Sequence, residues 1–283
     1  MGKKVLITGA GGYIGQHVIK KLIEIGADVS AVDVCFNKID PAVKIYKEDI
    51  FSSDESVYER LGSPDVCLHM AWKDGFNHNS IAHMGDLSEH YRFIQNMVSG
   101  GLKQIVVMGS MHEVGYHEGM IKDDTPCNPL SYYGIAKDAL RRSLMLMAEQ
   151  RNLLLQWIRA YYIYGDDERS NSIFGKLIRA AEAGEKKFPF TTGKNKYDFI
   201  HVDELAKQIV AVLMQEKVGG IINCCSGKAV SLAEQVEKFI KINQLNIELE
   251  YGKFPDREYD SPAVWGDNTK IKKILNDTIL NNL

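Results

Sequence analysis

The stretch Val5-Leu-Ile-Thr-Gly9-Ala-Gly-Gly12-Tyr-Ile-Gly15 decides the fold of this chain. Its apolar start predicts a buried strand, its glycines predict a turn, and the residues after them predict a helix. The glycine spacing suits a tight turn, a close approach of the backbone to a pyrophosphate, and tight packing of helix on strand. Free N–H groups at the start of such a helix favour an anion. The stretch therefore predicts a dinucleotide site, with cofactor contacts from Gly9, Gly12, Tyr13, Ile14 and Gly15.

Acidic residues at the ends of the next two predicted strands support a dinucleotide. Asp33 lies about twenty residues after Gly15, where a carboxylate accepts hydrogen bonds from both ribose hydroxyls and repels a 2′-phosphate. This favours NAD over NADP, although the nearby Lys38 leaves NADP open. Asp49 and Ile50 are predicted to lie beside the adenine, whose amine a carboxylate can reach. The alternative role for Asp49 is to cap the helix that follows it.

The rest of the chain predicts an α/β fold. Strand-like and helical segments alternate through the first 165 residues, which indicates a parallel sheet covered on both faces. The expected strands are Val5–Thr8, Asp28–Val32, Lys44–Lys47, Val66–His69, Gln104–Met108 and Leu154–Arg159, and the expected helices are Ile14–Ile25, Ser53–Leu61, His83–Ser99 and Tyr132–Gln150. Later segments predict helices at Ile173–Ala183, Glu204–Gln215, Leu232–Asn243 and from Thr269, and strands at Phe199–Val202, Gly220–Cys224 and Ile247–Tyr251.

The predicted architecture is a Rossmann-type doubly wound parallel sheet with a smaller α/β C-terminal lobe. Residues 1–165, with roughly 203–226, are expected to form the dinucleotide-binding domain. Residues 166–202 and 227–283 are expected to form a substrate lobe. The glycine turn would then lie at the carboxyl edge of the sheet, where such folds bind their ligands.

Composition excludes several other classes of protein. With 45% hydrophobic residues, the 283-residue chain can bury a core and is not disordered. A net charge of −3 gives no basic footprint for nucleic acid. Five cysteines without CxxC spacing predict reduced thiols, not a disulfide framework or a zinc site, and no metal is expected. No apolar run reaches the length of a membrane span, so we expect a cytoplasmic protein.

Tyr133 and Lys137, in Pro129-Leu-Ser-Tyr-Tyr-Gly-Ile-Ala-Lys137, add chemistry to the dinucleotide site. Residues four apart share one face of a helix. An ammonium beside a phenol favours the phenolate, and so it lowers the pKa of the phenol from about 10. Tyr133 thus becomes a candidate acid/base near neutral pH. Taken alone, the spacing is more typical of an exposed Tyr/Lys pair on a helix.

Taken together, these motifs resemble the extended short-chain dehydrogenase/reductase family, of the NAD-dependent epimerase/dehydratase type. The resemblance covers nearly the whole chain, and the matching segments follow in the family's order. They are Thr8–Gly15, Asp33, Asp49-Ile50, His69-Met-Ala71-Trp, Gly109–Val114, Tyr133–Lys137, Ile158–Gly165, Asp198–Asp203 and Arg257–Asp267. The fourth of these resembles the family's HLAA segment along the cofactor, which implies contacts from Met70 and Ala71.

Within the family, two segments most resemble reductases of dTDP-4-keto-6-deoxyhexoses, such as those that form dTDP-fucose. The segments are Met111–Tyr116 and Pro126–Lys137. The resemblance implies an NAD(P)H-dependent oxidoreductase of nucleotide-sugar metabolism. It would reduce the 4-keto group of a nucleotide-diphosphate 4-keto-6-deoxy sugar, with a dTDP sugar favoured. The resemblance thus implies an enzyme of the same kind as the dTDP-4-dehydro-6-deoxyglucose reductases of polysaccharide biosynthesis.

The resemblance also implies the catalytic roles. Tyr133 would protonate the alkoxide that forms at C4, and Lys137 would lower the pKa of Tyr133 and bind the nicotinamide ribose. Ser110 would donate to the carbonyl oxygen. However, Met111 stands where the family's catalytic Ser/Thr is expected. Either Ser110 takes the role through a local shift, or His112 supplies the hydrogen bond.

Two further departures concern the substrate. Tyr162 replaces the family's common asparagine, and Tyr197 replaces an arginine that often precedes the segment beginning at Asp198. Arg257 could bind the diphosphate, because a guanidinium bonds phosphate with two parallel hydrogen bonds. It could instead form a surface ion pair with Asp256 or Asp260. Other basic residues that could compensate for Tyr197 are Lys194 and Lys196.

Several residues near the predicted cleft could contact the sugar. His78 and Asn79 follow the strand end of His69–Trp72, although a solvated loop is the alternative. His112 and Glu113 stand where dehydratase relatives carry an Asp-Glu pair, and only Glu113 fits, which argues against 4,6-dehydration. Either residue could instead be a loop residue in contact with water. The predicted substrate contacts are His78, Asn79, His112, Glu113, Tyr162 and Arg257.

Two other functions stay open, and one assembly is implied. A sugar-nucleotide 4-epimerase would use the same Tyr/Lys pair with tightly retained NAD. A redox-inactive regulatory protein that binds dinucleotide is a second alternative, against which the intact pair argues. The resemblance implies a homodimer, for which Leu140, Leu144 and Met147 could form a face, unless they are core. His201 is expected in the core.

Overall fold

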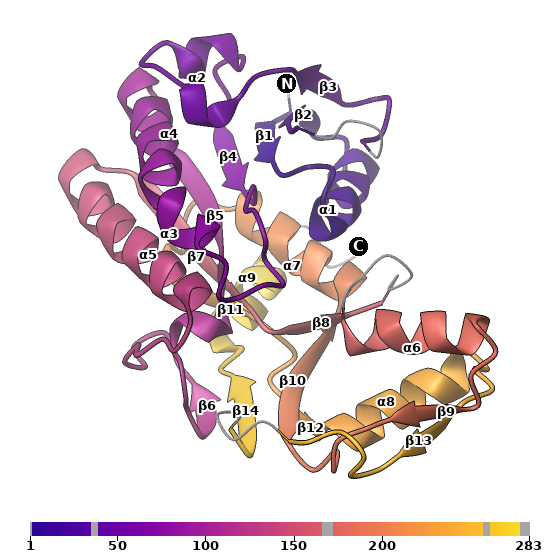
Figure 1. The fold of residues 1–283 in the computed structure, drawn as a ribbon. Coiled ribbons are helices and arrows are strands. Elements are labelled where there is room, and N and C mark those ends of the chain that lie inside the picture. Colours follow the sequence, from indigo (N-terminus) through magenta and orange to yellow (C-terminus); the bar gives the residue numbers. More distant parts are fainter. Residues whose placement is uncertain (1, 35–38, 166–171, 257–260, 278–283) are drawn as a thin grey trace.

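The computed structural model describes residues 2–34, 39–165, 172–256 and 261–277. A large sheet packs between helices, and a smaller group of strands and helices lies below it and to one side (Figure 1). The strands are β1 (Lys4–Thr8), β2 (Asp28–Val32), β3 (Lys44–Tyr46), β4 (Val66–His69), β5 (Gln104–Ser110), β6 (Gly119–Ile121), β7 (Leu154–Ala160), β8 (Tyr162–Tyr164), β9 (Lys187–Pro189), β10 (Lys196–His201), β11 (Gly220–Cys224), β12 (Ala229–Ser231), β13 (Glu248–Glu250) and β14 (Ala263–Gly266). The helices are α1 (Tyr13–Glu24), α2 (Val57–Arg60), α3 (Ala82–Gly85), α4 (Leu87–Gly100), α5 (Tyr132–Arg151), α6 (Ile173–Glu182), α7 (Val202–Leu213), α8 (Leu232–Ile242) and α9 (Thr269–Asp277), with 3₁₀ turns η1 (Ile50–Ser52) and η2 (Met111–Glu113).

The large sheet has the strand order β11-β7-β5-β4-β1-β2-β3, and its neighbouring strands are parallel. The chain runs outward from β1 through β2 and β3, then returns to β4 on the other side of β1. This reversal is the switch point at which open parallel sheets bind ligands. The predicted doubly wound parallel sheet is confirmed.

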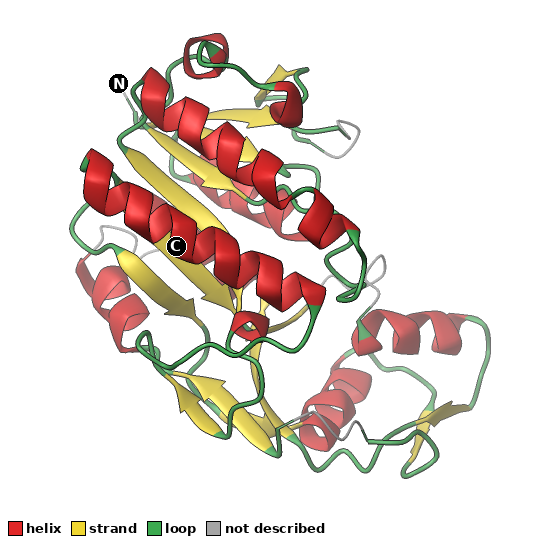
Figure 2. Cartoon of the chain, turned by 60° about the vertical axis from the view of Figure 1, so that its left-hand side comes forward, coloured by secondary structure: helices red, strands yellow, loops and turns green. Residues whose placement is uncertain are grey.

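Helices cover both faces of this sheet, as the sequence predicts. Helices α1, α7 and α9 pack on one face and bury residues such as Val18, Ile209 and Ile274. Helices α4 and α5 cover the other face and lie side by side in front of the strands in Figure 2. Residues Leu140, Leu144 and Met147 of α5 are 0–6% exposed in the core beneath them. They are therefore core residues, and the alternative of a dimer face made from them is wrong.

A second sheet, of order β12-β10-β14-β6 with β8 also paired to β10, builds the smaller group. The fully buried carboxylate of Asp198, in β10, links several segments of this smaller group. It accepts hydrogen bonds from the backbone N–H groups of Ser226, Gly227 and Gly266 at 2.8, 2.9 and 3.1 Å. The sequence did not predict β6, β8, β9, β12 or β14, which are three or four residues long, although it did predict the equally short β3, β4 and β13.

The C-terminal helix α9 leaves the smaller group and packs against α7 of the large sheet. Ile271 and Ile274 of α9 belong to the same buried cluster as β1 and α1. The division of the chain into a dinucleotide-binding domain and a substrate lobe stays a prediction. Within the described ranges, none of the helices has the length and apolar character needed to cross a bilayer.

Replacement of Asp198 should destabilise the protein. In Asp198→Ala the buried N–H groups of Ser226, Gly227 and Gly266 lose their acceptor, so we expect a loss of about 3 kcal/mol in the free energy of unfolding. Urea denaturation measures it, and the matched control is Asp28→Ala, at an exposed position on β2. Equal stability of the two variants would contradict the role given to Asp198.

Candidate functional site

The glycine turn after β1 forms a cradle that only glycine fits. Gly9 has a φ of +72°, and a Cβ there would lie 2.6 Å from the amide nitrogen of Ala71. A Cβ on Gly15 would lie 2.5 Å from the carbonyl oxygen of Ala10. Helix α1 begins directly after this turn, with no side-chain cap and no acidic residue in its first turn. A tight backbone turn leading to an uncapped helix start fits the pyrophosphate of a dinucleotide.

The two acidic residues differ in where the structure places them. Asp33 lies at the glycine turn, because its carboxylate accepts a hydrogen bond from the Gly11 N–H at 2.8 Å. Asp49 caps η1 and accepts from the Phe51 N–H at 2.9 Å. The capping role weighed for Asp49 is therefore confirmed, while its contact with adenine, and that of Ile50, stay predictions. Lys38 lies outside the described residues.

The remaining predicted cofactor contacts surround the turn. The Tyr13 hydroxyl donates to the Gly165 carbonyl, which ties the start of α1 to the end of β8. The half-buried Ile14 packs on the core below. The N–H groups of Met70 and Ala71 both donate to Thr8 Oγ1, at 3.2 and 3.1 Å. These bonds hold the segment after β4 against the end of β1, as a wall beside the glycine turn.

Tyr133 and Lys137 come together in the first two turns of α5. Ser131 caps this helix and accepts from the Gly134 N–H at 3.2 Å. Lys137 is 2% exposed, and its ammonium donates to the Met108 carbonyl at 2.7 Å. It lies 5.8 Å from the centre of the Tyr133 ring. The alternative of an exposed Tyr/Lys pair is therefore wrong.

Burial changes the pKa values of both groups, and for Tyr133 in the direction opposite to the one expected. Burial raises the pKa of Tyr133 to about 12; the charge of Glu113 adds to this, and a hydrogen bond with Ser110 opposes it. Burial lowers the pKa of Lys137 to about 7, against which the Glu113 charge acts. The expected lowering treats both groups as solvated, whereas here desolvation of the charged form is the largest cause of each shift.

Ser110, not Met111, is the residue that reaches Tyr133. Ser110 ends β5 and is 7% exposed, and its Oγ accepts from the His112 N–H at 3.2 Å. Its hydrogen bond with Tyr133 places the hydroxyl at the phenol. Met111 is 6% exposed and packs in the core of the smaller group. Ser110 thus lies beside Tyr133, and its role at the carbonyl oxygen stays a prediction.

Two histidines line the same place. The His78 carbonyl accepts from the Tyr133 N–H at 2.9 Å, and its ring stacks on the Tyr133 ring at 5.0 Å between centroids. The His112 ring lies 4.4 Å from that of His78 and 6.4 Å from that of Tyr133. Asn79, the next residue in the loop, is exposed. The structure therefore brings His78 and His112 to Tyr133.

The two tyrosines that depart from the family pattern contact each other. The rings of Tyr162 and Tyr197 lie 4.3 Å apart at 32°, and Tyr162 lies 6.3 Å from His112. A row of aromatic rings therefore runs from Tyr133 through His112 to Tyr162 and Tyr197 of the smaller group. Arg257 lies outside the described residues. His201, expected in the core, is half-exposed and caps α7 through the Asp203 N–H.

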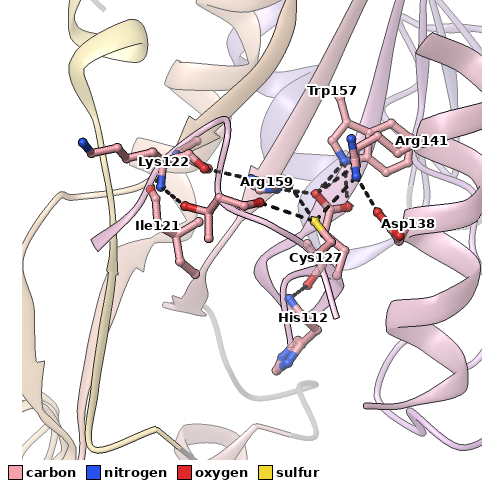
Figure 3. Close-up of polar contacts among 12 residues, drawn as sticks. His112, Ile121, Lys122, Cys127, Asp138, Arg141, Trp157 and Arg159 are labelled. Carbon is pink, nitrogen blue, oxygen red and sulfur yellow. Dashed lines mark hydrogen bonds and ion pairs between the residues drawn. The ribbon is translucent and has the colours of Figure 1, made fainter. Parts of the chain in front are cut away.

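Glu113 points away from this group of residues. Its carboxylate is fully buried and accepts from Trp157 Nε1 at 2.8 Å and from Arg159 Nε (Figure 3). Arg141 of α5 lies 3.8 Å away, and it also pairs with Asp138. The structure gives Glu113 a place in an ionic cluster beneath η2, in contrast to the predicted contact with substrate.

This cluster links the catalytic turn to the smaller group. Arg159 Nη1 donates to the Lys122 carbonyl at 3.0 Å, and its Nη2 lies 3.3 Å from Cys127 Sγ (Figure 3). Sequence reasoning missed the structural role of Arg159, because the sequence of an apolar strand does not show which groups a buried guanidinium will contact. Among the described residues, no group of three or more His, Cys, Asp or Glu side chains is placed to hold a metal ion.

Comparison with known proteins agrees with this geometry. Residues 5–225 match the model of the NAD dependent epimerase/dehydratase family. The dTDP-6-deoxy-L-talose 4-dehydrogenase (NAD(+)) of Aggregatibacter actinomycetemcomitans is 42% identical over 93% of this chain and 98% of its own. A UDP-glucose 4-epimerase of Lactobacillus helveticus is 23% identical over 96% of this chain and 91% of its own. The solved UDP-glucose 4-epimerase of Stenotrophomonas maltophila shares the fold, with a TM-score of 0.85 at 18% identity over 97% of this chain and 92% of that one.

The buried lysine makes stability depend on pH in a defined direction. With the pKa of Lys137 lowered to about 7, the folded protein loses this proton well before the unfolded chain does. Between pH 7 and 9 the unfolded state therefore binds more protons, and stability rises with pH. Over this range, we expect the free energy of unfolding of wild type to rise by about 2 kcal/mol more than that of Lys137→Met, which has no titrating group at this position.

Urea denaturation of both proteins at pH 7 and pH 9 measures this difference. Other titrating groups are common to the two proteins and cancel in the comparison. The same pH dependence in wild type and Lys137→Met would contradict the desolvation of Lys137.

Proposed function

The chain belongs to the NAD-dependent epimerase/dehydratase family, and we propose that within it this protein transfers hydride at C4 of a dTDP-6-deoxyhexose. It is an NAD-dependent enzyme that acts on a nucleotide sugar. The proposed reaction is reduction of the 4-keto sugar to the 4-hydroxy sugar. The relative that is 42% identical is named for the same transfer in the opposite direction.

The observation that carries the proposal is the meeting of Ser110, Tyr133 and Lys137 beside the glycine turn. Ser110 comes from the end of β5, and the other two come from the start of α5. When bound, NADH supplies the hydride. The residues fitted to hold the dinucleotide are those of the cradle after β1, with Asp33 at the ribose and Lys137 at the nicotinamide side.

The protein supplies the proton and stabilises the charge on oxygen. As C4 accepts the hydride, the C4 oxygen becomes an alkoxide and takes the phenolic proton of Tyr133. Ser110 donates to the same oxygen and stabilises its developing charge. The resulting phenolate is then reprotonated from solvent, and the ammonium of Lys137 favours it in the meantime.

The protonation state of the free site fits Tyr133 as the proton donor. A phenol whose pKa is raised to about 12 keeps its proton at neutral pH. The site thus holds Tyr133 in the form that reduction consumes. The buried position of Glu113 also supports a simple transfer at C4, because this carboxylate is turned away from the place where a dehydratase needs its base.

Substrate recognition and assembly complete the proposal. We assign the sugar contacts to His78, Asn79, His112 and Tyr162, and the diphosphate contact to Arg257. The relative's name favours the L-talo configuration of the product. We also propose a homodimer in the cytoplasm that serves polysaccharide biosynthesis. Its interface would use outward residues of α5, such as Leu146, which is 57% exposed.

Removal of the phenolic hydroxyl should abolish most of the activity. For Tyr133→Phe we expect kcat to fall about a thousandfold, because the proton donor is lost while the ring and its contacts stay. Steady-state NADH consumption measures this. The matched control is Tyr132→Phe, whose 46%-exposed side chain should leave kcat within about twofold of wild type. Similar activity of the two variants would contradict the role of Tyr133.

The identity of the reaction can be tested with purified substrates. Wild type should produce NADH when it is given NAD and dTDP-6-deoxy-L-talose. It should consume NADH when it is given NADH and the corresponding 4-keto sugar. Freshly generated GDP-, UDP- and CDP-4-keto-6-deoxy sugars serve as controls for the base. Interconversion of C4 epimers with retained NAD and no net change in NADH would show a 4-epimerase instead.

A further inference from the structure

We infer that Trp72 is a positioning residue that holds the ammonium of Lys137 in place for the reaction. The inference rests on the proposed function, in which Lys137 serves Tyr133. Lys137 Nζ lies 3.5 Å from the centre of the Trp72 indole. An ammonium over an aromatic face is attracted by the ring, most strongly by tryptophan and most of all where water is excluded. Lys137 is 2% exposed, so its site meets this condition.

Two contacts together define where the ammonium lies. The Met108 carbonyl accepts one of its protons at 2.7 Å, and the Trp72 ring meets the same group. A lysine side chain has a flexible stem of four carbons, so a single hydrogen bond leaves the ammonium free to move. The contact with the indole restricts this movement of the ammonium. Trp72 also meets the Tyr133 ring edge-on, with 6.2 Å between centroids, so it contacts both members of the catalytic pair.

The indole is itself held by residues of α3 and α4, two helices that pack against α5. Its Nε1–H donates to His83 Nδ1 at 3.0 Å. His83 therefore carries its proton on Nε2, which donates to the Asn77 carbonyl at 2.8 Å. The Trp72 ring also stacks on His90, with centroids 4.3 Å apart at 9°.

The support extends back to the dinucleotide turn. Thr8 Oγ1 accepts from two backbone N–H groups, so its own proton goes to His69 Nδ1 at 2.9 Å. His69 then donates through Nε2 to His90 Nδ1 at 2.9 Å. Burial lowers the pKa of His69 to about 3 and that of His90 to about 2. Both rings stay neutral, so neither adds a second positive charge beside Lys137.

The same chain of contacts explains the sequence departure at this position. In the segment that resembles HLAA, Trp72 stands in place of the second alanine. An alanine there would remove the indole face from the ammonium of Lys137 and leave the hydrogen bond to the Met108 carbonyl. The tryptophan thus supplies a contact that the usual residue could not.

A measurement on the cofactor-free protein tests the contact itself. Protons beneath an indole face resonate upfield, so one lysine ε-methylene signal of wild type should lie upfield of the others in a spectrum of the ¹³C-lysine-labelled protein. Lys137→Met should remove this signal and so assign it. In Trp72→Leu it should return to the range of ordinary lysines, and in Trp72→Phe it should stay upfield. A wild-type spectrum without a shifted lysine would overturn the inference.

Kinetics test the catalytic consequence. We expect kcat of Trp72→Leu to fall about tenfold and that of Trp72→Phe to stay within about threefold of wild type, with KM values for NADH and sugar changed little. The control Phe51→Leu removes a ring that contacts His90 at 4.9 Å and should keep kcat near wild type. Thermal melting of each variant separates these effects from unfolding.

Two outcomes would count against the positioning role. Equal kcat for Trp72→Leu and Trp72→Phe, or a loss confined to KM, would overturn it. Failure of wild type to turn over any keto sugar would instead refute the proposed function, and the NMR spectrum would then still decide whether Trp72 holds Lys137.

Discussion

Desolvation of the Tyr133–Lys137 pair is the constraint on which the rest of the site depends. An ammonium that is 2% exposed is costly unless polar or aromatic groups replace its water. Here the Met108 carbonyl and the Trp72 indole take that place. The same dry surroundings raise the pKa of Tyr133 and lower that of Lys137. In the free site, a protonated phenol therefore lies next to an amine that loses its proton easily. This arrangement suits the donation of one proton to a newly formed alkoxide.

The fold provides rigid supports for this pair from two directions. On the dinucleotide side, Thr8 anchors the segment that carries Trp72 through two backbone hydrogen bonds. On the other side, the ionic cluster of Glu113 with Arg159 and Arg141 joins η2, β7 and α5. Buried ion pairs add little net stability, but they fix geometry, since each partner tolerates few arrangements. The cluster thereby ties the η2 turn, which follows Ser110, to β7 and α5.

Sequence reasoning succeeded where a local pattern has one physical meaning. The parallel sheet, the glycine turn, the position of Asp33 and the pairing of Tyr133 with Lys137 all follow from short-range spacing. It failed where the outcome depends on partners distant in sequence. Glu113 could not be recognised as buried without Arg159, and the stacking of Tyr162 on Tyr197 joins two separate strands. The rise in the pKa of Tyr133 was missed for a similar reason, because burial is a property of the folded cleft.

The central claim is a net transfer of hydride to C4 of a dTDP-6-deoxyhexose, with the protein providing the proton. Its most direct test is to incubate the enzyme with a dTDP-4-keto-6-deoxyhexose and NADH carrying deuterium at the transferable position of nicotinamide C4. The account predicts a product with deuterium bonded to sugar C4, seen by NMR, and one NADH consumed for each product formed. A C4-hydroxy product without deuterium, or one formed with no loss of NADH, would contradict it.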